Sequence, residues 1–192
     1  MIMIHNRASR MATGLVNNKI IDGSSHDVYT YGFELMLSGL ANVVLIVMVS
    51  FAFHRYYDWV LFLSAFIPLR TTAGGYHAST HFRCIITGTT IFAILLLTSQ
   101  LRIDWTRVIL TVSTISFILV LSFSPVEVSN KKLTDMQRKK NRQISIYISS
   151  CNMLIAVATF FIEGFSGVLT IYFAGVFAAA LSMLVVKKQK KK

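Results

Sequence analysis

Fifteen consecutive residues, RTTAGGYHASTHFRC at positions 70–84, bring together side chains that could catalyse a reaction. They include His77 and His81 and end on Cys84. An ionised cysteine is a nucleophile, and both a neighbouring histidine and a helix N-terminus favour the thiolate. Because an apolar run follows Cys84, this residue is expected where a helix begins, and the helix dipole would stabilise its negative charge. The pattern therefore predicts a cysteine nucleophile.

The spacing of the two histidines leaves the identity of the base open. His81 lies three residues before Cys84, close enough for contact on one helix face. His77 lies seven residues before it, about 10.5 Å along a straight helix. Spacing alone slightly favours His81, and His77 could serve only if the chain bends across residues 78–80.

The remaining polar residues of this stretch suggest a binding site. Gly74 and Gly75 permit positive φ and a close approach of backbone amides, as an oxyanion hole or a simple loop turn requires. Arg70 could clamp a carboxylate, or could hold its charge at a membrane interface. Two histidines and one cysteine without a nearby carboxylate do not predict a metal site, and no ATP-binding GxxxxGK[ST] loop occurs, so we expect no cofactor.

Composition indicates an all-α, polytopic integral membrane protein. Of 192 residues, 54% are hydrophobic and 14% are charged, against about 25% charged in soluble domains. Six apolar segments occupy residues 33–53, 59–69, 84 or 85–101, 105–123, 144–162 and 165–186. All but the second can cross roughly 30 Å of hydrocarbon, and the second is short or re-entrant. We expect one membrane domain over residues 1–192 with about six transmembrane helices.

The N-terminal segment, residues 1–30, contains an amphipathic pattern. Ile4, Ala8, Met11 and Leu15 have helical spacing, with two arginines off that stripe. An interfacial helix lying on the membrane explains this pattern, and an ordinary packed helix explains it equally well.

The net charge of +11 is concentrated in two segments, residues 125–143 and 187–192. Eleven of the nineteen basic residues lie there: Lys131, Lys132, Arg138, Lys139, Lys140, Arg142, Lys187, Lys188, Lys190, Lys191 and Lys192. Basic segments beside apolar runs are typical of cytoplasmic loops, which places both termini in the cytoplasm and residues 70–84 at the cytoplasmic edge. Anionic lipid is the expected partner, and nucleic acid is not, because no aromatic residues are interleaved.

Non-helical backbone at membrane depth needs protein or water to hydrogen-bond its N–H and C=O groups, so residues 70–84 are expected to line a wet cavity.

Cys151 lies inside an apolar segment and is expected to be structural. On the last apolar segment, Ala174 with Ala178 and Gly175 with Ala179 have the spacing of close helix packing. This spacing predicts contact inside the protein or a homodimer.

Together these residues resemble a known family. The residues that carry the resemblance are Arg70, Gly74-Gly75-Tyr76-His77, Cys84, Pro125 and Asn130-Lys131-Lys132. They are similar to the pattern of the accessory gene regulator B family of bacterial membrane endopeptidases, from about residue 33 to the lysine tail. The GGYH sequence with a cysteine seven residues on is the specific part.

The resemblance implies a cysteine endopeptidase of the bacterial cell membrane that processes a small quorum-sensing propeptide. It implies that Cys84 is the nucleophile and His77 its partner, supported by Arg70 and Gly75, and therefore that the chain folds back between His77 and Cys84. A cysteine of the propeptide could then close a thiolactone ring. The lysines expected to contact propeptide or lipid are Lys131, Lys132, Lys139 and Lys140.

A small peptide transporter without proteolysis is the alternative, because six apolar segments with charged edges also suit an exporter. The middles of these segments contain almost no ionisable residues, and matching halves with broken helices are missing from the sequence. A non-catalytic scaffold has no specific feature in its favour.

Overall fold

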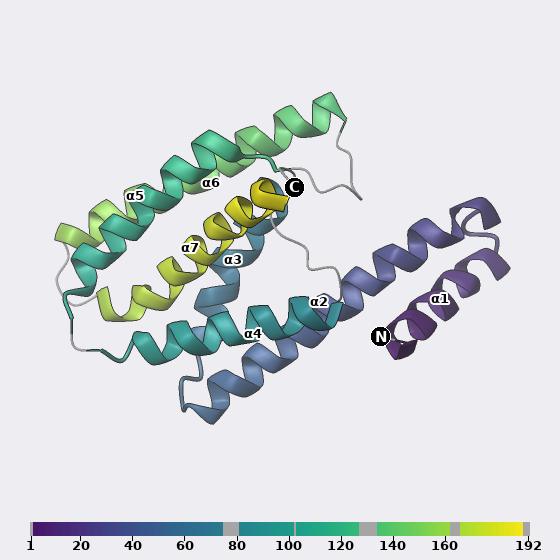
Figure 1. The fold of residues 1–192 in the computed structure, drawn as a ribbon, viewed down its shortest axis with the longest axis horizontal. Helices are drawn as coiled ribbons and strands as arrows, with labels where there is room; N and C mark the ends of the chain where they lie inside the picture. Colours follow the sequence, from purple (N-terminus) through teal and green to yellow (C-terminus); the bar gives the residue numbers. More distant parts are fainter. Residues whose placement is uncertain (1, 75–80, 102, 127–133, 162–165, 190–192) are drawn as a thin grey trace. The chain divides into compact units, whose positions relative to one another are not determined.

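The structure is a computed structural model that describes residues 2–74, 81–101, 103–126, 134–161 and 166–189. Over these residues the chain forms α1 (Ile2–Asn17), the short 3-10 helix η1 (Gly23–Ser25), α2 (His26–Ala52), α3 (Asp58–Ala73), α4 (His81–Thr98), α5 (Trp105–Phe123), α6 (Asp135–Phe161) and α7 (Ser166–Gln189) (Figure 1). These ranges contain no β-strand, so the all-α prediction is confirmed.

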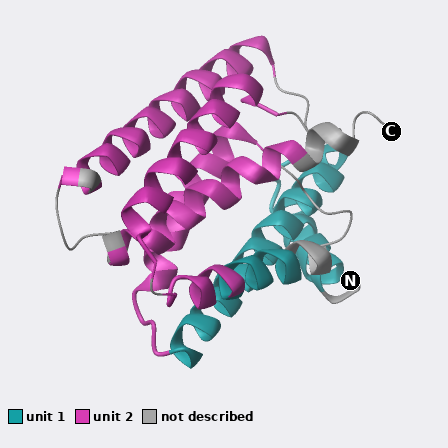
Figure 2. Cartoon of the chain, turned by 60° about the vertical axis from the view of Figure 1, so that its left-hand side comes forward, with its two compact units in different colours: residues 1–53, 78–93 teal, residues 54–77, 94–192 magenta. Residues whose placement is uncertain are grey.

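The helices form two compact units (Figure 2). The first comprises residues 1–53 and 78–93, and therefore holds α1, α2 and most of α4. The second comprises residues 54–77 and 94–192, and holds α3, α5, α6 and α7. A single domain over residues 1–192 stays a prediction.

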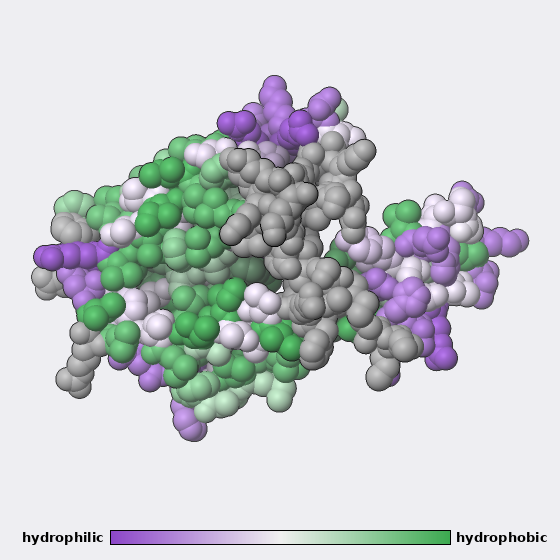
Figure 3. Space-filling view, viewed as in Figure 1, coloured by the Kyte–Doolittle hydropathy of each residue, from purple (hydrophilic) through white to green (hydrophobic). Residues whose placement is uncertain are grey.

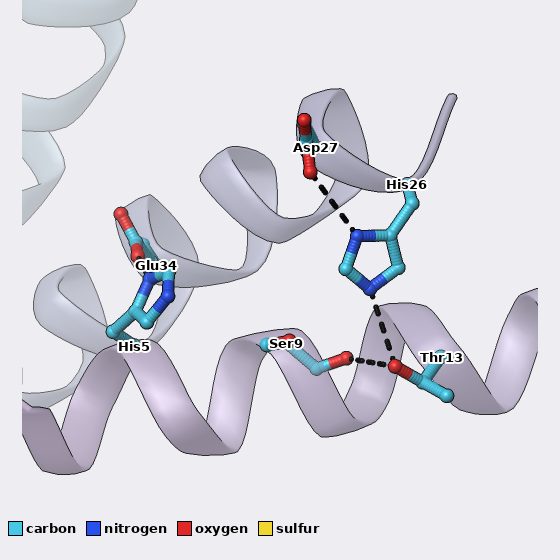
Figure 4. Close-up of polar contacts among 6 residues, drawn as sticks. All are labelled: His5, Ser9, Thr13, His26, Asp27 and Glu34. Atoms are coloured by element: carbon cyan, nitrogen blue, oxygen red, sulfur yellow. Dashed lines mark hydrogen bonds and ion pairs between the residues drawn. The ribbon is translucent and has the colours of Figure 1, made fainter. Parts of the chain in front are cut away.

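In the first unit, α1 packs antiparallel against the N-terminal part of α2. Ala8 and Ala12, one turn apart, are completely buried, and their small side chains let the helices approach closely. Two polar contacts join the helices, His5 to Glu34 and Thr13 to His26 (Figure 4). The amphipathic helix is thus confirmed, and it is a packed one; its position at a membrane interface stays a prediction.

The second unit has a continuous apolar core. Its buried members are Ala65, Leu69, Ala73, Ile109, Val120, Ala156, Phe173, Val176, Ala179, Ala180 and Met183. Polar contacts also join its helices: the Tyr172 hydroxyl of α7 donates to Asn152 Oδ1 of α6 at 2.6 Å. A hydrogen bond between helices is favourable where no water competes for the polar groups.

Helix α7 approaches α3 most closely at Gly175. A Cβ at Gly175 would lie 2.7 Å from the Phe62 carbonyl oxygen and 3.3 Å from the Ala65 Cβ. Ala179, one turn further along α7, is 1% exposed. The small-residue spacing of Gly175 and Ala179 therefore serves packing inside the chain, which was one of its two predicted uses.

We expect Gly175→Ala to destabilise the second unit, because α3 and α7 must separate to admit the methyl group. Overpacking of this kind costs about 1–3 kcal/mol. Gly167→Ala is the matched control on the same helix, since nothing lies within 4 Å of its Cβ position. Thermal unfolding in detergent checks this: equal midpoints for the two variants would contradict the packing.

Two helices of the described residues are long and apolar enough to cross a membrane, Gly23–Ala52 and Trp105–Phe123. Shorter apolar helices occupy Ile85–Thr98 and Leu169–Leu184. The 16 residues of α3 span about 24 Å, so this segment is short, as predicted. The full number of six spans stays a prediction.

Apolar side chains also cover much of the surface of the chain. On α2, a stripe of residues spaced four apart is at least half exposed: Met36, Leu40, Val44 and Met48. Apolar side chains cover much of the face in Figure 3, while hydrophilic ones gather over α1 and the first turns of α6. Exposed apolar area on this scale is unfavourable in water, and it supports association with a membrane.

Two boundaries differ from the sequence prediction. Residues 70–84 are not a non-helical stretch: α3 continues to Ala73 and α4 begins at His81. The chain has no helix breaker between Pro68 and Gly74, and the Thr71 and Thr72 hydroxyls donate to the Pro68 carbonyl inside the helix.

The basic segment 125–143 is likewise not a loop throughout, because α6 begins at Asp135. A capping box explains this start: the Thr134 hydroxyl accepts from the Gln137 N–H, and the Gln137 side chain accepts from the Thr134 N–H. Glutamine, lysine and arginine are also good helix formers.

Candidate functional site

Arg70 lies in the last turn of α3. Its neighbours Leu69 and Ala73 are buried in the core of the second unit, and Arg70 itself is half-buried. A cation in the last turn interacts favourably with the negative end of the helix dipole. The second unit therefore holds Arg70 on a packed helix end.

Gly74 ends α3 in a conformation that only glycine adopts readily. Its φ is +77° and its ψ is −168°, a region that a Cβ makes costly. Gly74 also pairs with Val126 in a parallel bridge. A Cβ at Gly74 would lie 2.2 Å from the Val126 carbonyl oxygen. Of the two predicted uses of Gly74, the turn is therefore observed, and oxyanion binding stays a prediction.

Residues 124–126, which follow α5, fix this turn from the other side. The Val126 N–H donates to the Ala73 carbonyl at 2.9 Å, satisfying one of the acceptors that a helix C-terminus leaves open. The Ser124 side chain is buried and hydrogen-bonds Ser145 of α6. Sequence reasoning noted Pro125 only through the family resemblance and missed Ser124, Val126 and Ser145. Contacts this distant in sequence leave no local pattern.

Cys84 is the fourth residue of α4, which begins at His81. The prediction that Cys84 stands at a helix N-terminus is thus confirmed at the level of the backbone. His81 and Cys84 are separated by three positions on this helix, the spacing of neighbours on one face. Their side chains lie outside what the structure describes, and so do the whole of Gly75 and His77.

Helix α4 contacts α2 within the first unit. Thr89 donates to the Asn42 side chain at 3.2 Å, and Ile85 is buried. A Cβ at Gly88 would lie 2.9 Å from Asn42 Nδ2. Gly88 and Thr89 follow Cys84 by four and five residues, so the contacts with Asn42 lie about one turn after the predicted nucleophile.

The basic residues divide between described and undescribed parts of the chain. Lys139 and Lys140 are exposed on the first turns of α6, where they can meet an acidic partner or a lipid headgroup. Lys131 and Lys132 lie outside the described residues. Cys151, in the middle of α6, is a half-buried free thiol, and its structural role stays a prediction.

Among the described side chains, no group of three His, Cys, Asp or Glu residues could hold a metal ion. Since His77, His81 and Cys84 are not among them, the expectation of a metal-free and cofactor-free site stays a prediction.

A comparison with known protein families supports the resemblance found in the sequence. The family model of accessory gene regulator B matches residues 8–186, which is nearly the whole chain. No curated protein and no solved structure gave a match. Proteins of this family are associated with membranes and process the propeptide AgrD in quorum sensing. The chain belongs to the accessory gene regulator B family.

Proposed function

We propose that this chain is a membrane cysteine endopeptidase that cleaves the AgrD-like propeptide and supports its cyclisation. The observation that carries the proposal is the position of Cys84 in the first turn of α4. There, backbone N–H groups without intrahelical partners and the helix dipole both favour a thiolate. His77 is the last residue of the GGYH sequence, and it precedes Cys84 by seven residues.

In the first step, the Cys84 thiolate attacks a carbonyl carbon of the propeptide. The tetrahedral intermediate collapses as the C–N bond breaks, and the histidinium of His77 gives its proton to the leaving amine. The C-terminal part of the propeptide departs, and the N-terminal part remains on Cys84 as a thioester. Arg70 holds a carboxylate of the propeptide, and Gly75 contributes a backbone N–H to the oxyanion.

In the second step, a cysteine thiol of the propeptide gives its proton to His77, which the first step left neutral, and attacks this thioester. One C–S bond forms as another breaks, so the exchange is nearly balanced in energy, and Cys84 leaves as a thiolate. The product is a thiolactone, or a lactone where a serine replaces the cysteine. Water would divert the thioester to a linear acid, so the bound propeptide must keep water away from the thioester.

The chain is proposed to cross the bacterial cell membrane several times, with both termini and the site on the cytoplasmic side. The exposed basic turns of α6 support this orientation, because Lys and Arg are enriched in cytoplasmic loops. Lys139 and Lys140 contact the propeptide or anionic lipid there, with Lys131 and Lys132.

The base is tested by comparing two histidine variants. We expect His77→Ala to slow cleavage of co-expressed propeptide by about a hundredfold or more, the usual contribution of a general acid–base. His81→Ala, three residues from Cys84, should retain most of the activity. Cleavage is followed by immunoblotting in membranes at matched expression. Loss in His81→Ala with full activity in His77→Ala would reverse the assignment.

A transporter without proteolysis would behave differently in these experiments. A transporter would carry the propeptide into sealed vesicles without cutting it, and neither Cys84 nor His77 would matter for that flux.

A further inference from the structure

A buried set of hydrogen bonds links α6 to the end of α3. Ser145 donates its hydroxyl proton to the Arg142 carbonyl of its own helix at 3.0 Å. A hydroxyl has one proton to give, so in the contact between Ser124 and Ser145 it is Ser124 that donates. Two residues later, the Val126 N–H donates to the Ala73 carbonyl.

We call Ser124, Ser145 and Val126 the strut; its two serines are buried and Val126 is half-buried. Ser124 is 5% exposed, Ser145 is completely buried, and Ala73, which receives the strut, is 1% exposed. Water therefore cannot replace a lost partner easily. Pro125, which lies between Ser124 and Val126, has no N–H of its own, so Val126 supplies the first backbone donor after Ser124.

Val126 of the strut contacts Ala73, the last residue of α3, and Gly74, and both precede the proposed base His77 in the sequence. Val126 is paired with Gly74, and His77 follows Gly74 by three residues. The Val126 carbonyl lies so close to Gly74 that a Cβ would not fit between them. The position of Val126 therefore limits the path that the backbone can take at Gly74. All the atoms of the strut belong to the second unit.

We propose that Ser124, Ser145 and Val126 are positioning residues that hold the Gly74 turn, and through it His77, for catalysis. The proposal rests on the proposed function, because it requires His77 to be the base. Displacement of a catalytic group by an ångström can slow a reaction by orders of magnitude without weakening substrate binding. The strut should therefore affect kcat and leave KM unchanged.

The two serines should differ in effect. Ser145→Ala leaves the Ser124 donor buried without an acceptor, whereas Ser124→Ala leaves the Ser145 bond to Arg142 intact. We expect kcat for propeptide cleavage to fall about tenfold in Ser145→Ala and about threefold in Ser124→Ala, with KM unchanged in both. The double variant should resemble Ser124→Ala alone, because removing the Ser124 hydroxyl also removes the donor that Ser145→Ala leaves without an acceptor.

Ser116→Ala is the matched control. Ser116 is completely buried on α5, but its hydroxyl donates only within its own helix, to the Val112 carbonyl at 2.7 Å. The four purified variants are compared in detergent for kcat, KM, thermal midpoint and the rate at which iodoacetamide alkylates Cys84. That rate should fall together with kcat in the two serine variants, because a displaced His77 no longer favours the Cys84 thiolate, and it should be unchanged in Ser116→Ala.

A kcat for Ser145→Ala equal to that of Ser116→Ala would overturn the strut, provided that Cys84→Ala is inactive in the same assay. Activity in Cys84→Ala would instead overturn the proposed function. If Ser145→Ala cannot be purified as a folded protein, Ser124→Ala decides, and an unchanged kcat in that variant would also overturn the strut.

Discussion

Cys84→Ala is expected to reduce propeptide cleavage on the order of a thousandfold or more, because it removes the atom that forms the acyl-enzyme. Cys84→Ser should be similarly impaired, since a serine hydroxyl at a site built to stabilise a thiolate stays protonated. Cleavage is measured with purified protein in lipid vesicles and synthetic propeptide. The helix that carries residue 84 should remain folded, because Gly88 and Thr89, and not Cys84, make its contacts with Asn42 of α2.

Cys151→Ala is the matched control for the first prediction, as it removes the chain's other thiol from the middle of α6. It should cleave the propeptide at close to the wild-type rate. Full loss in Cys151→Ala, or retained cleavage in Cys84→Ala, would show that the nucleophile is assigned to the wrong residue.

Gly74→Ala is expected to have the second-largest effect. The methyl group would lie 2.2 Å from the Val126 carbonyl oxygen, and the φ of +77° is itself unfavourable for alanine. The strut and the end of α3 must then separate. We expect cleavage to slow by about a hundredfold and stability to fall by about 1–3 kcal/mol, measured by single-turnover cleavage and thermal unfolding.

Gly39→Ala controls for the loss of a glycine. Gly39 lies inside α2 with nothing within 4 Å of its Cβ position, so alanine should leave cleavage unchanged and favour the helix by up to about 1 kcal/mol. A Gly74→Ala protein with normal stability and normal cleavage would mean that the pairing with Val126 does not shape the site.

The helices could be predicted from the sequence because their cause is local. Long apolar runs give α2 and α5, and the interval between Asp58 and the paired glycines limits α3 to a short helix. The start of α4 near Cys84 followed from the change from polar to apolar residues. Two helix ends were misjudged, and one of them is the start of α6: a run of charged residues at 135–143 suggested a loop, although Thr134 and Gln137 cap a helix there.

The contacts that shape the turn at Gly74 could not be predicted in this way. Val126 lies 52 positions after Gly74 (126 minus 74), and its interaction uses backbone atoms that every residue has. Serines 124 and 145 look like ordinary polar residues at helix ends, and only their burial against each other distinguishes them. In contrast, cysteine and histidine carry distinctive side chains, so Cys84, His77 and His81 could be proposed from the sequence, and the choice of His77 over His81 came from the family resemblance.

The most direct test of the central claim is to identify the acyl-enzyme. A propeptide whose ring cysteine is replaced by alanine cannot close the ring, so its thioester should persist on the protein. Rapid quenching in acid and mass spectrometry of the digested protein should then find the N-terminal propeptide fragment attached to Cys84, and hydroxylamine should release it. Cleavage without any adduct, or an adduct on Cys151, would contradict this mechanism.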